Sequence, residues 1–130
     1  SDIQSALGNK QIENLERIIN KRREIGKKYD SSFENKNFDL PTKTEGSFPF
    51  RYVIKFQSKE KRNNLLYKIR GEGIMAELPL YRPLHRYLEL DKSKFEFTEN
   101  AFNTSLSIPL YPALTDEEVH FIIRSVIENT

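Results

Sequence analysis

The feature that most constrains the fold is a run of apolar residues at helical spacing within the first thirty positions. These residues recur at intervals of three, four and seven, while Lys, Arg and Glu occupy the other faces. The apolar positions are Ile12, Leu15, Ile18, Ile19, Ile25 and Tyr29. The pattern predicts one long amphipathic helix from about Asp2 to Asp30, which Ser1 and Gln4 open as a capping box.

A helix of this length outspans the domain that follows it. At about 1.5 Å per residue it would extend roughly 40 Å, whereas a compact domain of this size has a radius of gyration of about 14 Å. We therefore expect its first turns, with Ile3, Ala6 and Leu7, to find no partner within the chain and to lie on an upstream domain or a second copy, as in a homodimer. Gly8 weakens this part of the helix by about 1 kcal/mol relative to Ala, so a kink or a close backbone contact is expected there.

The remaining segments predict a small α+β domain. Alternating apolar and polar residues indicate half-buried strands at 50–56 and 105–110, and 74–78 is a further short strand. A helix from Ser58 to Gly71 and a last helix opened by Thr115 complete the regular elements, whereas 79–87 is predicted as a loop and 91–103 as an irregular excursion. We predict a mostly antiparallel three-stranded sheet with helices packed on one face, preceded by the long N-terminal helix.

These elements form one domain over residues 1–130, with 1–30 as a connecting helix and 46–130 as the α+β part. Because the chain opens on a helix cap without an initiator Met, we expect it to be a fragment of a longer polypeptide.

Composition narrows the classes of function. The chain has 37% hydrophobic and 31% charged residues and no apolar run of membrane length. It contains 21 Lys and Arg against 19 Asp and Glu, a net charge of +2 that does not favour a nucleic-acid-binding surface. Cysteine is absent, which excludes disulfides, thiolate zinc sites and a cysteine nucleophile, and is consistent with the cytoplasmic location that we expect.

The two histidines, His85 and His120, have no further ligands at metal-binding spacing, so we predict no metal site and assign His120 no role.

The loop at 80–85 carries the candidate substrate-binding residues Tyr81, Arg82 and His85, between prolines 79 and 83 that restrict its backbone. An arginine grips phosphate, a tyrosine stacks on or hydrogen-bonds to a sugar, and a histidine donates to a hydroxyl. From the residues alone, a proline-stiffened surface loop without a ligand is the open alternative.

Four segments of the chain carry a family resemblance. They are Ser1 to Gly8, Arg22-Arg23-Glu24-Ile25, Pro83-Leu84-His85, and the stretch from Ser105 to Pro112 that continues into Thr115-Asp116-Glu117-Glu118-Val119. In this order and at this spacing they resemble the C-terminal part of the DegT/DnrJ/StrS group of pyridoxal-phosphate-dependent sugar aminotransferases, and together they span almost the whole chain.

The resemblance implies a fold-type-I transaminase that moves an amino group, usually from glutamate, onto a keto sugar linked to a nucleoside diphosphate. In such enzymes the Schiff-base lysine and most cofactor contacts belong to the upstream domain. The resemblance therefore assigns this chain no catalytic and no cofactor-binding residue, and implies that it is inactive alone but completes the substrate pocket and the subunit interface of a parent enzyme. His85 maps onto the family motif, with Tyr81 and Arg82 as its neighbours in the substrate site.

Two other interpretations stay open from the sequence. The same fold could serve as a stand-alone, non-catalytic binding module, and the basic residues of the first helix could bind nucleic acid, although Glu13, Glu16 and Glu24 interleave with them. An upstream coding region that supplies a cofactor lysine would favour the aminotransferase, whereas a start codon at Ser1 would favour the module.

Overall fold

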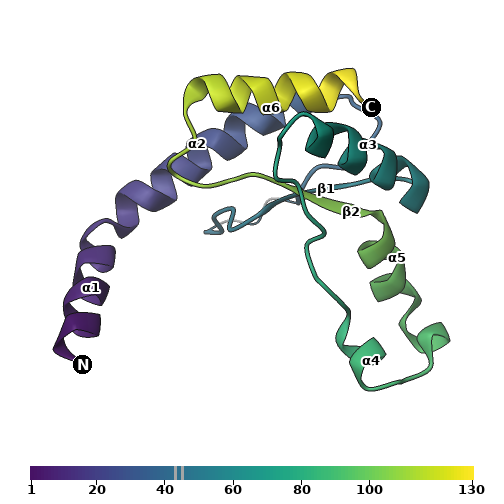
Figure 1. Ribbon diagram of the computed structural model, residues 1–130, viewed down its shortest axis with the longest axis horizontal. Helices are drawn as coiled ribbons and strands as arrows, with labels where there is room; N and C mark the ends of the chain where they lie inside the picture. The colour runs from purple at the N-terminus through teal and green to yellow at the C-terminus, as the bar shows by residue number, and fades with distance from the viewer. Residues whose placement is uncertain (43, 45) are drawn as a thin grey trace.

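The computed structural model describes residues 1–42, 44 and 46–130, and it is an α+β structure with helices around a two-stranded antiparallel sheet (Figure 1). Its elements in chain order are α1 (Asp2–Glu13), α2 (Leu15–Phe33), β1 (Tyr52–Lys55), α3 (Lys59–Gly71), α4 (Leu84–Tyr87), the 3-10 helix η1 (Lys92–Phe95), α5 (Glu96–Thr104), β2 (Ser105–Ile108) and α6 (Asp116–Glu128). Positions 43 and 45, in the polar loop before β1, lie outside the described residues.

The N-terminal helix is divided in two at Asn14, so the prediction of one continuous helix is wrong. Asn14 has φ −92° and ψ −2°, and its side-chain Nδ2 donates to the carbonyl of Lys10 over 2.8 Å. This side chain competes with the helical backbone for that carbonyl, and the chain turns between α1 and α2 (Figure 1). Gly8, where a kink was expected, lies within α1 with open space around it.

The sheet pairs two strands that are far apart in sequence. Tyr52 of β1 lies opposite Ile108 of β2, and Lys55 lies opposite Ser105. Tyr52, Ile54 and Ile108 are buried, as the alternating pattern predicts for a half-buried strand.

The segment at 74–78 is not a third strand, and that prediction is wrong. Glu77 forms an isolated antiparallel bridge with Ser107, in which each backbone N–H donates to the other residue's carbonyl over 2.9 and 2.8 Å. Just before it, the N–H of Ala76 donates to the carbonyl of Ile74 over 2.8 Å. This local turn removes the segment from regular strand geometry and limits its pairing to one position.

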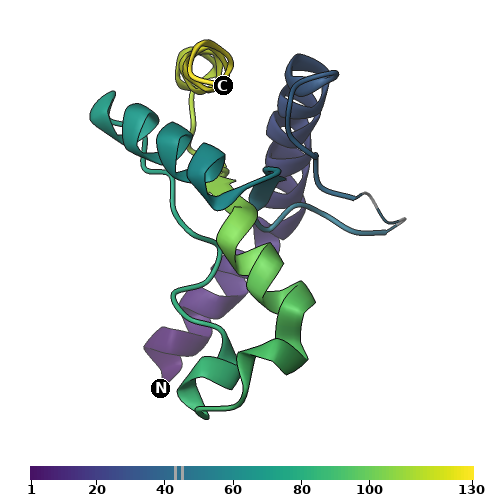
Figure 2. The same ribbon diagram turned by 90° about the vertical axis from the view of Figure 1, so that its right-hand side faces the viewer.

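The core lies between the sheet and three helices. Figures 1 and 2 show α2, α3 and α6 together on one side of β1 and β2. Their apolar stripes meet the inward-facing side chains of the strands, and the innermost residues include Ile25, Tyr29, Phe33, Ile54, Leu65, Ile69, Leu106, Val119 and Val126. Burial of these side chains is the main stabilising contribution to the body of the molecule.

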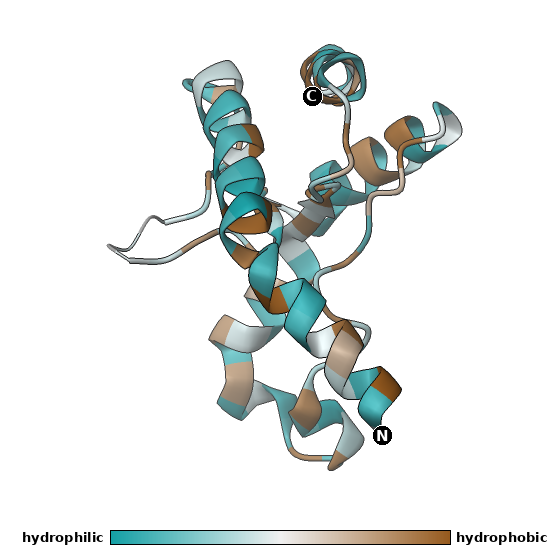
Figure 3. Ribbon diagram, turned by 90° about the vertical axis from the view of Figure 1, so that its left-hand side faces the viewer, coloured by the Kyte–Doolittle hydropathy of each residue, from teal (hydrophilic) through white to brown (hydrophobic). Residues whose placement is uncertain are grey.

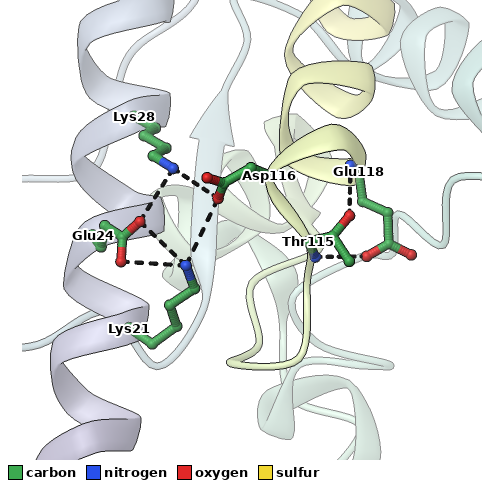
Figure 4. Close-up of polar contacts among 6 residues, drawn as sticks. All are labelled: Lys21, Glu24, Lys28, Thr115, Asp116 and Glu118. Atoms are coloured by element: carbon green, nitrogen blue, oxygen red, sulfur yellow. Dashed lines mark hydrogen bonds and ion pairs between the residues drawn. The ribbon is translucent and has the colours of Figure 1, made fainter.

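The start of α6 is fixed by local and long-range contacts (Figure 4). The last helix begins at Thr115, as predicted, and Thr115 forms a capping box with Glu118: Glu118 N–H donates to Thr115 Oγ1 over 3.2 Å and Thr115 N–H donates to Glu118 Oε2 over 2.8 Å. Lys28 Nζ of α2 donates to Asp116 Oδ1 over 2.9 Å, and this hydrogen bond lowers the pKa of Asp116. The contact joins the first turn of α6 to α2.

Residues 79–104, which we call the arm, leave the body after the bridge at Glu77 and return at β2. Figures 1 and 2 show α4, η1 and α5 extending away from α3 and α6. The prediction of an irregular excursion at 91–103 is wrong, because Asp91 caps η1 by accepting the N–H of Ser93 over 3.0 Å and the chain continues directly into α5.

Helix α1 is exposed on all sides in this chain. None of its residues is buried, and Ile3 and Leu7 are 75% and 63% exposed. Figure 3 shows apolar positions along α1 among hydrophilic ones. The expectation that its apolar residues lack a partner within the described chain is confirmed. Within the described residues, no helix combines the length and apolar character that a membrane span requires.

Candidate functional site

The structure separates the three predicted substrate-binding residues into an exposed pair and a buried one. Tyr81 is 91% exposed and Arg82 is also exposed in the loop that precedes α4. His85 lies within α4 and is only 5% exposed. Tyr81 and Arg82 are therefore available to a ligand directly, whereas His85 is held inside the arm.

His85 is held by contacts with both other helices of the arm. Its Nε2 lies 2.7 Å from Oε1 of Glu99 on α5. Its ring stacks on Phe95 at the end of η1, with 4.5 Å between ring centroids and 8° between ring planes. These two contacts fix the position and the plane of the imidazole ring.

Arg86 completes the polar group around Glu99. Its Nε donates to Glu99 Oε1 over 2.7 Å and its Nη2 donates to Glu99 Oε2, a two-point contact between guanidinium and carboxylate. The guanidinium carbon lies 4.7 Å from the centroid of the Phe102 ring. We call His85, Arg86, Phe95, Glu99 and Phe102 the arm cluster.

The arm cluster keeps Glu99 ionised. The hydrogen bond from Arg86, and after it the one from His85, lowers the pKa of Glu99 to about 2. At neutral pH the carboxylate therefore accepts hydrogen bonds and does not donate one.

The side chain of Arg82 is oriented by contacts with Arg86 and Tyr87 of α4. Its Nη2 donates to the carbonyl of Arg86, and its guanidinium carbon lies 4.9 Å from the centroid of the Tyr87 ring. Because Arg82 is exposed, its other N–H groups can reach an anionic group such as a phosphate.

The prediction of an irregular segment at 91–103 does not reveal Phe95 and Glu99, and the prediction of a loop at 79–87, where the structure has α4, does not reveal Arg86. A usable signal was present. Phe95, Glu99 and Phe102 are spaced by four and three residues, which places them on one face of a helix.

A groove of about 510 Å³ lies where β1 begins and β2 ends. Its lining includes Arg22, Phe50, Met75, Tyr111 and Phe121. Arg22 Nη1 donates to the carbonyls of Phe50 and Leu110 over 2.7 and 2.9 Å. The guanidinium of Arg22 therefore fixes two loops against α2. This gives Arg22, one of the basic residues of the helix, a structural role.

The described residues do not fit a pyridoxal phosphate site. A Schiff-base lysine needs an enclosed pocket that lowers its pKa. Every lysine in the described part of the chain is at least partly exposed, and the pKa of Lys28 is raised, first by its hydrogen bond with Asp116 and then by that with Glu24. The described residues also bring no three His, Asp or Glu side chains together at metal-binding distance.

An α+β body with a projecting arm of this form occurs in solved sugar aminotransferases. Spr1654 of Streptococcus pneumoniae, a proposed sugar aminotransferase solved in its PMP form, superposes with a TM-score of 0.88 at 27% identity over 97% of this chain and 34% of its own. Helicobacter pylori PseC, an aminotransferase involved in the biosynthesis of pseudoaminic acid, superposes with a TM-score of 0.83 at 27% identity over 98% of this chain and 36% of its own.

The sequence profile of the DegT/DnrJ/EryC1/StrS aminotransferase family matches residues 1–127, and the chain belongs to this family. Among its relatives is the dTDP-4-dehydro-2,3,6-trideoxy-D-glucose 4-aminotransferase of Saccharopolyspora spinosa, which is 31% identical over 126 residues, 94% of this chain and 32% of the relative. The chain thus spans about a third of the length of the relatives that it matches.

Proposed function

We propose that this chain is the C-terminal part of a pyridoxal-phosphate-dependent aminotransferase that acts on a nucleotide-linked keto sugar in amino-sugar biosynthesis. Membership of the family and the match to about a third of the length of sugar aminotransferases support this proposal. The cofactor, when bound, supplies the amino-transfer chemistry, and its site belongs to the part of the relatives that this chain does not span. The chain alone then transfers no amino group.

The arm contributes the substrate contacts of this chain. The observation that carries this assignment is an exposed arginine and an exposed tyrosine, Arg82 and Tyr81, on a loop that the arm cluster holds in place. Arg82 is suited to the diphosphate of a nucleotide sugar and Tyr81 to stacking on a base or a sugar ring. His85, which is 5% exposed, contributes through the small part of its side chain that reaches the surface.

Helix α1 contributes the contact with the rest of the enzyme. Its exposed apolar residues, Ile3 and Leu7, are followed by Ile12 and Leu15, which are also exposed. Exposed apolar residues along α1 and at the start of α2 are costly in water and are expected to be covered by the upstream domain or by a second copy in a homodimer.

The test uses the longer enzyme and separates its two half-reactions. Arg82→Ala and His85→Ala should each reduce single-turnover use of the sugar nucleotide roughly ten- to a hundredfold, as expected for the loss of a contact of about 1.5–3 kcal/mol, and should leave the half-reaction with glutamate nearly unchanged. His120→Ala, which removes an exposed histidine from α6, is the matched control and should change neither. Equal losses in both half-reactions, or no loss in either, would contradict the assignment.

A further inference from the structure

One ring nitrogen of the buried His85 is committed to Glu99 and the other is not. Nε2 lies 2.7 Å from Glu99 Oε1, whereas no hydrogen bond reaches Nδ1 from any residue that the structure describes. The His85 side chain is 5% exposed, its ring stacks on Phe95, and its Nε2 contacts Glu99, so the ring has little freedom to rotate. Whether Nδ1 of the neutral ring carries a proton therefore depends on the contact between Nε2 and Glu99.

The protonation of the cluster decides which nitrogen carries the ring proton. Glu99 is ionised at neutral pH and accepts hydrogen bonds only. The proton between Glu99 and His85 must therefore lie on Nε2. A neutral imidazole has one ring proton, so Nδ1 is left as a bare acceptor.

Arg86 keeps this arrangement from changing. Its two-point contact fixes both oxygens of the Glu99 carboxylate and balances its charge. The carboxylate cannot rotate away from His85 without breaking a hydrogen bond to Arg86. The geometry thus couples the tautomer of His85 to an ion pair that itself lies between α4 and α5.

We propose that Glu99 is a positioning residue that holds His85 in its Nε2–H tautomer, so that Nδ1 accepts a hydrogen bond from a hydroxyl or N–H group of the bound sugar nucleotide. This inference rests on the proposed function and deepens it. It assigns the anionic part of the substrate to Arg82 and a neutral donor group to His85. In its neutral form His85 then accepts a hydrogen bond from the substrate and does not donate one, which differs from the donor role expected from the sequence.

The tautomer is measured first, in the 130-residue chain labelled with 15N at histidine. At pH 8, long-range 15N–1H spectra should show His85 with a protonated Nε2, a bare Nδ1 and a slowly exchanging Nε2–H signal. His120 is exposed and gives an internal control without such a signal. In Glu99→Gln, where the side-chain amide can also donate to Nε2, the His85 spectrum should change to a mixture of tautomers. Arg86→Lys keeps the charge and removes the two-point contact, so the carboxylate can rotate away from His85 and the Nε2–H signal should exchange faster. This variant provides a second test if Glu99→Gln does not fold.

The second measurement uses the longer enzyme. Glu99→Gln should lower specificity for the sugar nucleotide roughly tenfold through KM, with the glutamate half-reaction unchanged. The double variant His85→Ala/Glu99→Gln should lose no more than His85→Ala alone, because Glu99 acts through His85. Additive losses would point to a purely structural role and overturn the inference.

The two proposals fail in distinguishable ways. A protonated Nδ1 in the unaltered chain, or an unchanged tautomer and unchanged specificity in Glu99→Gln, overturns the role of Glu99 while leaving the proposed function intact. If the spectra behave as expected but His85→Ala does not affect use of the sugar nucleotide, the hydrogen bond from the substrate is refuted, and with it the proposed role of His85 in the substrate site.

Discussion

At the scale of single residues, two tyrosines show how polar groups are accommodated in the core. The hydroxyl of Tyr29 donates to the carbonyl of Pro109 over 2.8 Å, and that of Tyr52 donates to Asp30 Oδ1 over 2.9 Å. Their rings meet edge to face with 4.9 Å between centroids. Burial raises the pKa of both hydroxyls, so they stay protonated and act as donors.

We expect Tyr29→Phe to lower the free energy of unfolding by about 1 kcal/mol, because the ring keeps its packing while the buried carbonyl of Pro109 loses its donor. Urea unfolding followed by circular dichroism measures the change. Tyr81→Phe removes the same hydroxyl from an exposed ring and should change the free energy of unfolding by less than about 0.5 kcal/mol. Equal stabilities of the two variants would show that the Tyr29 hydrogen bond contributes nothing.

At the scale of elements, the decisive feature is the break between α1 and α2. The side chain of Asn14 takes the Lys10 carbonyl, and the N–H of Asn14 donates to Gln11 over 3.2 Å in place of a regular helical bond. The direction of α1 relative to the body therefore depends on one short polar side chain.

Asn14→Ala should join α1 and α2 into a straighter helix, because alanine removes the competing side chain and has a higher helix propensity. Spin labels at the exposed positions Ser5 and Lys27 should report a longer and narrower distance distribution. Asn20→Ala gives the same gain in propensity within α2 and is the matched control, for which the distances should not change. An unchanged distribution in Asn14→Ala would place the cause of the break elsewhere.

Helix boundaries and contacts between helices show most clearly which features can be predicted from the sequence and which cannot. Starts of helices at Ser58 and Thr115 were predictable because a cap is a local hydrogen bond between residues three apart. The break at Asn14 was not, since asparagine also occurs inside helices and the outcome depends on where its side chain donates. The burial of His85 was not predictable either, because its contact with Glu99 exists only once α5 lies beside α4.

At the scale of the whole molecule, α1 and the arm lie at opposite ends of the long axis and extend to the same side (Figures 1 and 2). The body between them contains the buried core, whereas α1 contains no buried residue. A helix of this length without packing is marginal in water, so its order should depend on what it contacts.

Hydrogen exchange at several protein concentrations tests this expectation. Amides from 2 to 10 should exchange quickly in a monomer and become protected if a dimer forms through α1, while those of Val53, Ile54, Ile108 and Ile122 should stay slow. Comparing several protein concentrations provides the control, because only protection that comes from contact between molecules changes with concentration. Slow exchange from 2 to 10 in a demonstrated monomer would show that α1 needs no cover.

The paired hydrogen bonds between Glu77 and Ser107 have a consequence for how such a chain can vary over evolution. They close the arm at its base, so insertions or replacements within it do not change the positions of its two ends. Doubling the length of a closed loop raises the entropic cost of closure by only about 0.6 kcal/mol. The arm can therefore change in length and in sequence while the sheet and the core keep their structure.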